Sequence, residues 1–242
     1  VERVRTQQLT RINSELNNPG AIAARALAPL IYGAEHPYGI PPSGLGEAAV
    51  VRSLSAADLR NFHDSWLRPD RGNIYIVGDT TLEQIVPLLE RSFGDWRAPS
   101  TPGPVKNFDA AIPVPSQRIV LIDRPNSPQS IITAARVLDL RGTDDLVALR
   151  GANEVFGGSF LSRINMNLRE TKGWSYGVRS SVSGNRDRVA FTITAPVQAD
   201  RTADSIVELR RDLASFTSDS GVDAAELERF VNGSVRELPG QF

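Results

Sequence analysis

Apolar side chains recur at helical spacing through the first part of the chain. Residues 1–32 predict helix, with a break around residues 17–20, where Asn-Asn-Pro-Gly interrupts the pattern. The stretch GAEHPYGIPPSG at 33–44 predicts a loop because of its glycine and proline content.

Two capping boxes mark further helices. Ser55 begins the first box. The helix after it carries one apolar face, formed by Leu59, Phe62 and Trp66. NIYIV at 73–77 then predicts a short buried strand. Thr81 begins the second box, and Pro87 in the following helix is expected to kink that helix or to shift its start.

Strands and helices alternate in pairs along the second half of the chain. Strands are predicted at 118–122 and 130–138, and a hairpin is predicted around residues 185–187. Helical patterns occupy DDLVALRGANEVF, SFLSRINMNLRET and, roughly, residues 200–216 and 223–236. This order favours an α+β fold, with a mostly antiparallel sheet and helices packed on one face.

A change in composition suggests where the domains divide. The Pro-rich stretch at 97–116 has no periodicity and predicts a linker. We therefore expect residues 1–96 to be the C-terminal part of a first domain, and residues 117–242 to be a second domain, incomplete at its C-terminus. The first part has the order helices, strand, helix, which is the order expected at the end of a unit like the second part. This suggests a duplicated architecture.

The composition excludes several classes of protein. Lys and Arg number 27 and Asp and Glu number 28, so the formal net charge of −1 favours no nucleic-acid partner. No apolar run approaches the roughly 20 residues of a membrane span, and the absence of cysteine excludes disulfides and thiolate metal sites. The chain opens in a helical pattern without Met or a signal segment, so we expect a piece of a longer polypeptide.

Local motifs for catalysis are absent from the sequence. A zinc site on a helix needs two histidines four positions apart, and neither His36 nor His63 has such a partner. There is also no Gly-x-Ser-x-Gly motif and no glycine-rich phosphate loop. Local motifs alone therefore do not make this chain an enzyme, and no catalytic residue or metal ligand is predicted within it.

The stretch LRETKGWSYGVRSS at 168–181 carries the strongest candidate for function. A helix tail runs through Lys-Gly into an alternating strand, with Arg169 before the junction and Tyr176 after it. The residue types alone also allow a structural role, since arginine is favourable near a helix C-terminus. Ser159 and Asn165 flank the same helix and could contact a ligand, although a helix cap and a solvent-facing side chain are the expected roles.

Taken together, several stretches resemble the pitrilysin/insulinase family of zinc metallopeptidases, most closely its mitochondrial-processing-peptidase-like branch. GAEHPYGIPPSG is similar to the loop after that family's zinc helices. SAADLRNFHDSWLRPDRGNIYIVGD and the helix that ends in FGDW are similar to the close of one family domain. GGSFLSRINMNLRETKGWSYGV is similar to the signature of the next domain. The resemblance covers nearly the whole chain.

This resemblance implies both a fold and a role. Family domains are α+β layers that come in pairs, and two pairs close like a clamshell around an unfolded peptide. One pair carries the zinc, and the opposing pair supplies an arginine and a tyrosine, which Arg169 and Tyr176 match in spacing. Both are therefore implied to bind substrate, because a guanidinium and a phenol hydroxyl stabilise the oxyanion that develops on an attacked peptide carbonyl.

The chain departs from the family at the third zinc ligand, a glutamate that should fall inside it. An alignment anchored at residues 18–19 places Arg11 there, and Val4 replaces a second family glutamate. An arginine repels Zn²⁺ and cannot ligate it. Glu15, one helical turn along, is the nearest alternative. We therefore expect zinc in a catalytic partner or in a segment outside this chain.

Three functions remain open. The first is a non-catalytic subunit or half of a clamshell peptidase, which would form a heterodimer with a zinc-bearing partner and bind an extended peptide. The second is a fragment of a self-sufficient zinc endopeptidase. The third is a structural core subunit of the processing-peptidase type, in which neither Arg169 nor Tyr176 matters for proteolysis. Bacterial relatives of this branch are often exported, so a periplasmic or exported bacterial protein is expected.

Overall fold

The computed structural model describes residues 1–240 of the chain, which forms two compact units. One unit combines Val1–Ser14 with Leu45–Asn107. The other combines Glu15–Gly44 with the chain from Phe108 onward.

The first unit consists of helices and irregular segments. Its helices are α1 (Glu2–Leu16, whose last residues belong to the second unit), α3 (Ala48–Ser53), α4 (Ala56–Trp66), η1 (Pro69–Arg71) and α5 (Leu82–Phe93). Arg5 ties α1 to α3, because its guanidinium donates to the carbonyl oxygens of Val51 (3.2 Å) and Leu54. The predicted helices of this part of the chain are confirmed, including the break after Leu16.

Both predicted capping boxes form. The Asp58 N–H donates to Ser55 Oγ (3.2 Å), and the Ser55 N–H donates to Asp58 Oδ2 (2.7 Å). At α5, the Thr81 N–H donates to Gln84 Oε1 (3.2 Å). The helix begins at Leu82, directly after the cap residue Thr81, and includes Pro87, so the proline does not shift its start.

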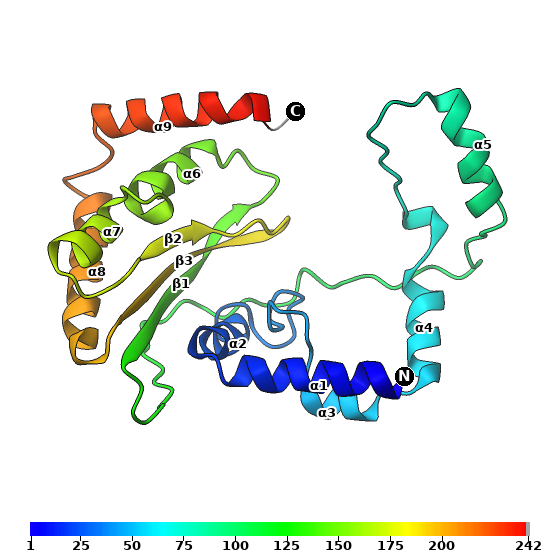
Figure 1. The fold of residues 1–242 in the computed structure, drawn as a ribbon, viewed down its shortest axis with the longest axis horizontal. Coiled ribbons are helices and arrows are strands. Elements are labelled where there is room, and N and C mark those ends of the chain that lie inside the picture. The colour runs from blue at the N-terminus through cyan, green and yellow to red at the C-terminus, as the bar shows by residue number, and fades with distance from the viewer. Residues whose placement is uncertain (241–242) are drawn as a thin grey trace. The chain divides into compact units, whose positions relative to one another are not determined.

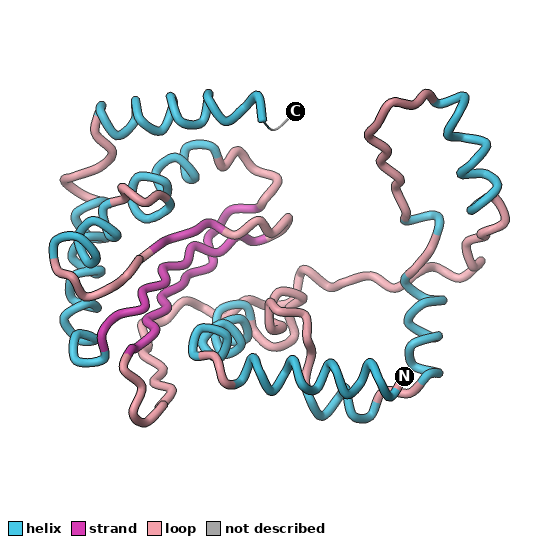
Figure 2. Tube along the Cα trace, in the orientation of Figure 1, coloured by secondary structure: helices cyan, strands magenta, loops and turns pink. Residues whose placement is uncertain are grey.

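Two predicted strands do not form. Residues 73–77 in the first unit and 118–122 in the second are irregular in the structure, and Figure 2 shows the long loop tracts to which they belong. A strand exists only where a neighbour accepts and donates its backbone hydrogen bonds. Apolar periodicity does not reveal whether such a neighbour is present, so it predicted strands that the described chain leaves unpaired.

The second unit contains an antiparallel sheet of three strands. Its strands are β1 (Gln129–Arg141), β2 (Arg179–Val182) and β3 (Arg188–Gln198), in the order β1-β3-β2. β2 and β3 form the predicted hairpin, and the predicted strand at 130–138 lies within β1. The α+β class and the antiparallel sheet are confirmed.

Successive side chains of β3 point to opposite faces of the sheet. One face carries Ile193, Ala195 and Val197, all buried, and packs against a helical layer. That layer consists of α6 (Val147–Asn153), η2 (Glu154–Gly158), α7 (Arg163–Asn165), η3 (Met166–Thr171) and α8 (Thr202–Thr217). η2 and η3 are π-helical, and they interrupt what the sequence predicts as two continuous helices. The helical layer as a whole contributes Phe156, Ile164, Leu168 and Leu209 to the core.

The opposite face of the sheet receives α2 (Pro19–Tyr32) near one end, as Figure 1 shows. Tyr32 is buried there against Val137 and Ala190, which are paired in the β1–β3 register. Its hydroxyl donates to the Arg188 carbonyl oxygen (3.0 Å) and accepts from Asn185 Nδ2 (2.9 Å). One tyrosine therefore joins α2 to the β2–β3 hairpin.

The loop at 33–44 is anchored to the same hairpin. The Asp187 N–H donates to the Tyr38 hydroxyl (3.2 Å), so Tyr38 anchors the loop. His36 is buried beside it, with its ring stacked on Tyr32 and its Nδ1 accepting from the Tyr38 N–H (3.0 Å). His36 is thus part of an aromatic cluster in the interior.

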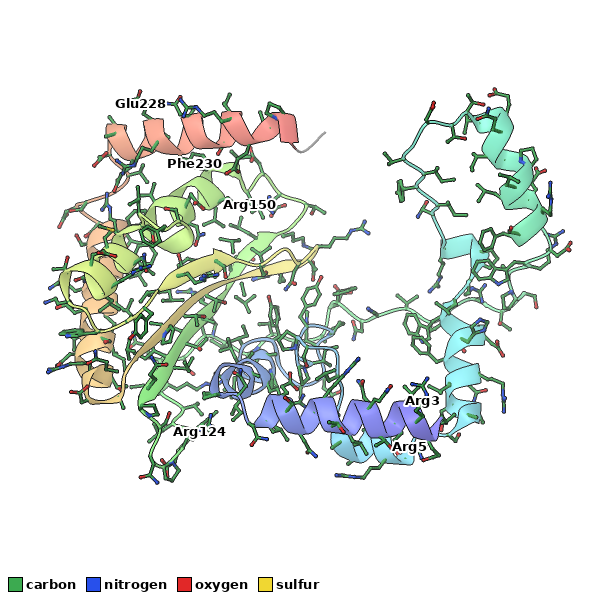
Figure 3. All side chains as sticks on the ribbon, in the orientation of Figure 1. Arg3, Arg5, Arg124, Arg150, Glu228 and Phe230 are labelled. Atoms are coloured by element: carbon green, nitrogen blue, oxygen red, sulfur yellow. The ribbon has the colours of Figure 1, made fainter. Side chains whose placement is uncertain are left out.

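Helix α9 (Ala224–Glu237) covers the outside of the helical layer, with η4 (Ala199–Arg201) and η5 (Leu238–Gly240) as short turns elsewhere. Phe230 of α9 faces α6 in Figure 3. A Cβ at Gly151 would lie 2.9 Å from its ring, so the glycine makes room for the aromatic side chain. Arg163 fixes the start of α9 through two hydrogen bonds to Glu226, at 2.8 and 2.6 Å.

Candidate functional site

The corner predicted at 168–181 is a tightly fixed turn between η3 and β2. Gly173 ends the helical segment with a φ of 67°, a conformation that glycine adopts without steric cost. Its N–H donates to the Arg169 carbonyl oxygen (3.1 Å), and the Trp174 N–H donates to the Leu168 carbonyl oxygen (2.9 Å). This pair of nested bonds is one residue wider than a Schellman motif, and it turns the chain sharply out of the π-helical segment.

The backbone on both sides of Tyr176 is held by hydrogen bonds. Ser175 Oγ donates to the Pro196 carbonyl oxygen of β3 (2.5 Å) and accepts from the Gly177 N–H (3.1 Å). The Gln198 N–H donates to the Trp174 carbonyl oxygen (2.9 Å). The Tyr176 side chain itself is 88% exposed. A fixed backbone therefore presents a phenol to solvent.

Arg169 lies on η3, at the other side of the same turn. Its guanidinium carbon is 4.5 Å from the centre of the Phe160 ring, and its Nε lies 3.1 Å from Glu170 Oε1. Stacking on an aromatic ring holds the guanidinium plane while leaving its edge available for hydrogen bonds. Phe160 is 58% exposed, so an apolar surface adjoins the cation.

The arrangement offers two strong hydrogen-bond donors on a rigid mount. Within residues 1–240 no hydrogen bond or ring contact joins Arg169 to Tyr176 directly. Each can therefore donate to an oxygen of a bound molecule, the guanidinium through several N–H groups and the phenol through one O–H. Carbonyl oxygens of an extended backbone and carboxylates are the acceptors that suit such a pair.

Three neighbouring residues have clear roles, and one of them corrects an expectation. Ser159 Oγ donates to the Glu154 carbonyl oxygen (3.0 Å), so it caps the end of η2. Trp174 packs partly buried at the edge of the core. Asn165, expected to face solvent, is 97% buried at 3% exposure and bonds to both arms of the corner. Sequence reasoning also missed Phe160, whose only signal was an apolar residue in a polar Gly-Ser turn.

The residues at the expected zinc-ligand position do not fit a metal. Arg11 is exposed on α1. Glu15 already pairs with Arg25 at 2.5 Å, and hydrogen bonds from Ser43 and then Arg25 hold the pKa of its carboxyl below the ordinary value. Among residues 1–240, His, Asp and Glu side chains nowhere gather in threes that could hold a metal ion.

A cavity of about 1170 Å³ lies elsewhere in the second unit. It is bounded by α2, β1 and the extended segment at 108–127, and neither Arg169 nor Tyr176 lines it. The polar corner and this mostly apolar hollow are therefore separate features. In the part of the chain that the structure describes, no helix combines the length and the apolar character of a membrane span.

Comparisons with known proteins agree on one family. The family model described as the peptidase M16 inactive domain matches residues 53–234. An uncharacterized zinc protease of Mycobacterium tuberculosis is 26% identical over 244 residues, which cover 98% of this chain and 52% of the relative. The chain thus spans about half the length of the curated relatives it matches.

Solved structures share the fold over almost the whole chain. A peptidase M16 inactive domain from Pseudomonas fluorescens superposes with a TM-score of 0.79 at 21% identity, covering 100% of this chain and 56% of that one. The periplasmic protease PqqL from Escherichia coli superposes with a TM-score of 0.75 at 17% identity, covering 98% and 26%.

The α+β unit, with its antiparallel sheet and helical layer, has the fold of a peptidase M16 inactive domain. The chain belongs to the peptidase M16 inactive domain family, since the family model matches well over half of its length. The resemblance to the pitrilysin/insulinase metallopeptidases is therefore confirmed.

Proposed function

We propose that this chain is the non-catalytic half or subunit of a clamshell peptidase, and that Arg169 and Tyr176 bind the backbone of an extended peptide. The zinc would be carried by a separate family partner. The observation that carries the proposal is the fixed corner, in which hydrogen bonds hold the backbone beside an 88% exposed tyrosine.

The chemistry of the corner supports this role. Peptide carbonyl oxygens accept hydrogen bonds, and negative charge develops on one of them when the peptide bond is attacked. A guanidinium and a phenol held in place stabilise that charge without reorganising, and the loss of one such donor costs about 10²–10³ in rate. Arg169 would contribute charge and several N–H groups, while Tyr176 would contribute a neutral O–H.

The partner and the location are parts of the same proposal. A partner with zinc is needed because the described residues hold no matching set of ligands and an arginine stands where the family has a glutamate. We place the protein in the periplasm or another exported compartment, by analogy with the periplasmic PqqL, whose fold this chain shares. Peptides in that compartment would be the substrates.

The test is peptidase activity of the full-length protein mixed with a zinc-bearing family partner. Tyr176→Phe removes only the hydroxyl, and Arg169→Lys keeps the positive charge but removes the planar guanidinium with its several N–H donors. We expect each substitution to lower kcat/KM for a quenched fluorescent peptide by about 10²–10³, because each removes a donor to the reacting carbonyl. Initial rates across peptide concentrations give the measurement.

Matched controls separate this effect from general damage. Tyr75→Phe changes a tyrosine that is 87% exposed in the first unit, and Arg210→Lys changes an exposed arginine of α8. Both controls should leave the rate within about twofold. Activity that survives Tyr176→Phe and Arg169→Lys unchanged would reject the proposal and favour a structural core subunit.

A second candidate is a self-sufficient zinc peptidase of which this chain is one part. The observation in its favour is that a curated relative of about twice the matched length carries the name zinc protease. On this alternative, the full-length protein alone binds about one zinc and cleaves peptides without a partner. Metal analysis of the full-length protein distinguishes the two candidates.

A further inference from the structure

One buried amide connects the two sides of the Arg169–Tyr176 corner. Asn165 closes the short helix α7, and its side chain is almost completely shielded from solvent at 3% exposure. A buried amide costs free energy unless its donor and acceptor are both satisfied. The partners of Asn165 lie on opposite sides of the corner.

The first bond supports the arginine. Asn165 Nδ2 donates to the Phe160 carbonyl oxygen at 2.7 Å, which fixes the backbone of the residue whose ring lies beneath the Arg169 guanidinium at 4.5 Å. Phe160 stands in an irregular turn between η2 and α7, where no helix or sheet ladder would hold it. The bond therefore sets where the aromatic platform lies.

The second bond supports the tyrosine. Asn165 Oδ1 accepts from the Val178 N–H at 2.9 Å, two residues after Tyr176 and immediately before β2. Ser175 already holds the chain on the other side through Pro196. With Val178 fixed as well, Tyr176 is confined between two anchored positions.

We propose that Asn165 is the positioning residue of this site, holding the Phe160 platform under Arg169 with its donor and the end of the Tyr176 loop with its acceptor. The inference rests on the proposed peptide-binding function and assigns to it a residue that touches no substrate. Asparagine suits the place because a single short side chain carries a donor and an acceptor on one carbon. Alanine offers neither, and aspartate offers acceptors only.

The test uses Asn165→Ala and a matched control, Asn167→Ala. Asn167 lies two residues on and also makes two amide hydrogen bonds, to Glu208 (2.9 Å) and Asp212 (2.7 Å), but both partners are on α8. Each variant thus loses two comparable bonds, and only one loses them at the corner. Asn165→Asp is a third variant, which keeps an acceptor for Val178 and removes the donor to Phe160.

The first readout is amide hydrogen exchange in the full-length protein, resolved at Gly177 and Val178. We expect exchange at Val178 to quicken at least about tenfold in Asn165→Ala, because the Val178 N–H loses its partner and becomes open to solvent, whereas the Gly177 N–H keeps Ser175 Oγ as its acceptor. Asn167→Ala should leave these amides unchanged, and Asn165→Asp should protect Val178 better than alanine does. Equal effects of the two alanine variants would overturn the inference.

The second readout is kcat and KM of the complex with the zinc-bearing partner, on the same fluorescent peptide. We expect Asn165→Ala to lower kcat about tenfold to a hundredfold, the scale of a small misplacement, and to add little further loss in a Tyr176→Phe background. If Tyr176→Phe lowers the rate and Asn165→Ala does not, this inference alone fails. If neither changes the rate, the proposed function fails as well.

Discussion

At the scale of single residues, the ion pair between Arg163 and Glu226 holds α9 on the helical layer. The pair is largely buried, at 28% and 11% side-chain exposure. The hydrogen bond from Arg163 is the main reason why the pKa of Glu226 lies below its ordinary value, and partial burial opposes it. The Glu226 carboxylate therefore binds a proton more weakly in the folded protein than in the unfolded chain.

The direction of this pKa shift determines how the stability of the protein depends on pH. The stabilisation from Glu226 is fully present above the unfolded-state pKa of about 4.5 and is lost as pH falls through the lower folded-state pKa. We expect Glu226→Gln to lower the free energy of unfolding by about 1–2 kcal/mol at pH 7, with the difference shrinking toward pH 3. Urea unfolding at several pH values measures it.

Glu228→Gln is the control for that prediction, because Glu228 is an exposed carboxylate on the same helix. It should change the free energy of unfolding by less than about 0.5 kcal/mol. A Glu226→Gln effect that stays constant from pH 7 to pH 3 would contradict the assigned ion pair.

Residue-level sequence reasoning succeeded where chain geometry was local. The corner between Arg169 and Tyr176 was predictable because a Lys-Gly stop after a helical pattern marks a helix end, while the substrate-binding role that the family resemblance implies for the pair stays a prediction. Asn165 was expected to face solvent, because a continuous helix was assumed through residues that instead form a three-residue helix followed by a π-helical segment. A change from α-helix to π-helix rotates the side chains that follow it, and the periodicity of the sequence does not reveal such a change.

At the scale of elements, the π-helical segment η2 depends on Gly157. A Cβ there would lie 2.4 Å from Ser180 Oγ and 2.7 Å from the Ser180 backbone nitrogen, closer than atoms can approach. The glycine therefore lets η2 pack directly on β2. Local sequence patterns do not reveal this close approach, because it joins segments far apart in the chain.

Gly157→Ala should destabilise the protein by about 1–3 kcal/mol, the usual cost of overpacking, because backbone atoms of β2 must shift. Gly184→Ala is the matched control, since nothing lies within 4 Å of its Cβ position. Thermal unfolding of the two variants measures the difference. Equal melting temperatures would show that η2 does not pack on β2 in this way.

Most helices and the hairpin were predictable because capping boxes, Gly stops and apolar spacing are local signals. The strands expected at 73–77 and 118–122 were not formed, because pairing depends on a neighbour that local pattern cannot supply. The assignment of residues 1–96, 97–116 and 117–242 as domain, linker and domain stays a prediction.

At the scale of the whole molecule, the first unit exposes apolar side chains that the sequence pattern marks for burial. Val77 is 99% exposed and Tyr75 is 87% exposed in the segment expected to be a strand. Phe62 on α4 is also exposed at 58%. Exposed apolar segments with strand propensity favour association with other chains.

We expect this 242-residue chain, expressed alone, to bind a hydrophobic dye and to self-associate through the segment at 73–77. Val77→Lys should reduce both, because a charge interrupts a strand-prone apolar run. Light scattering and dye fluorescence give the measurement. Thr80→Lys, in the same exposed loop, is the control for added charge, and an equal reduction by both variants would contradict the role of Val77.

The anchored loop around Tyr176 has a consequence for the thermodynamics and timing of binding. Since Ser175 and Val178 are already tied down, a peptide that meets the tyrosine has almost no loop to organise. Only the tyrosine side chain needs to be immobilised, at about 0.5–1.5 kcal/mol. On the proposed function, the corner would therefore stay fixed while the peptide binds, and any movement that closes on the peptide would come from the opposing side.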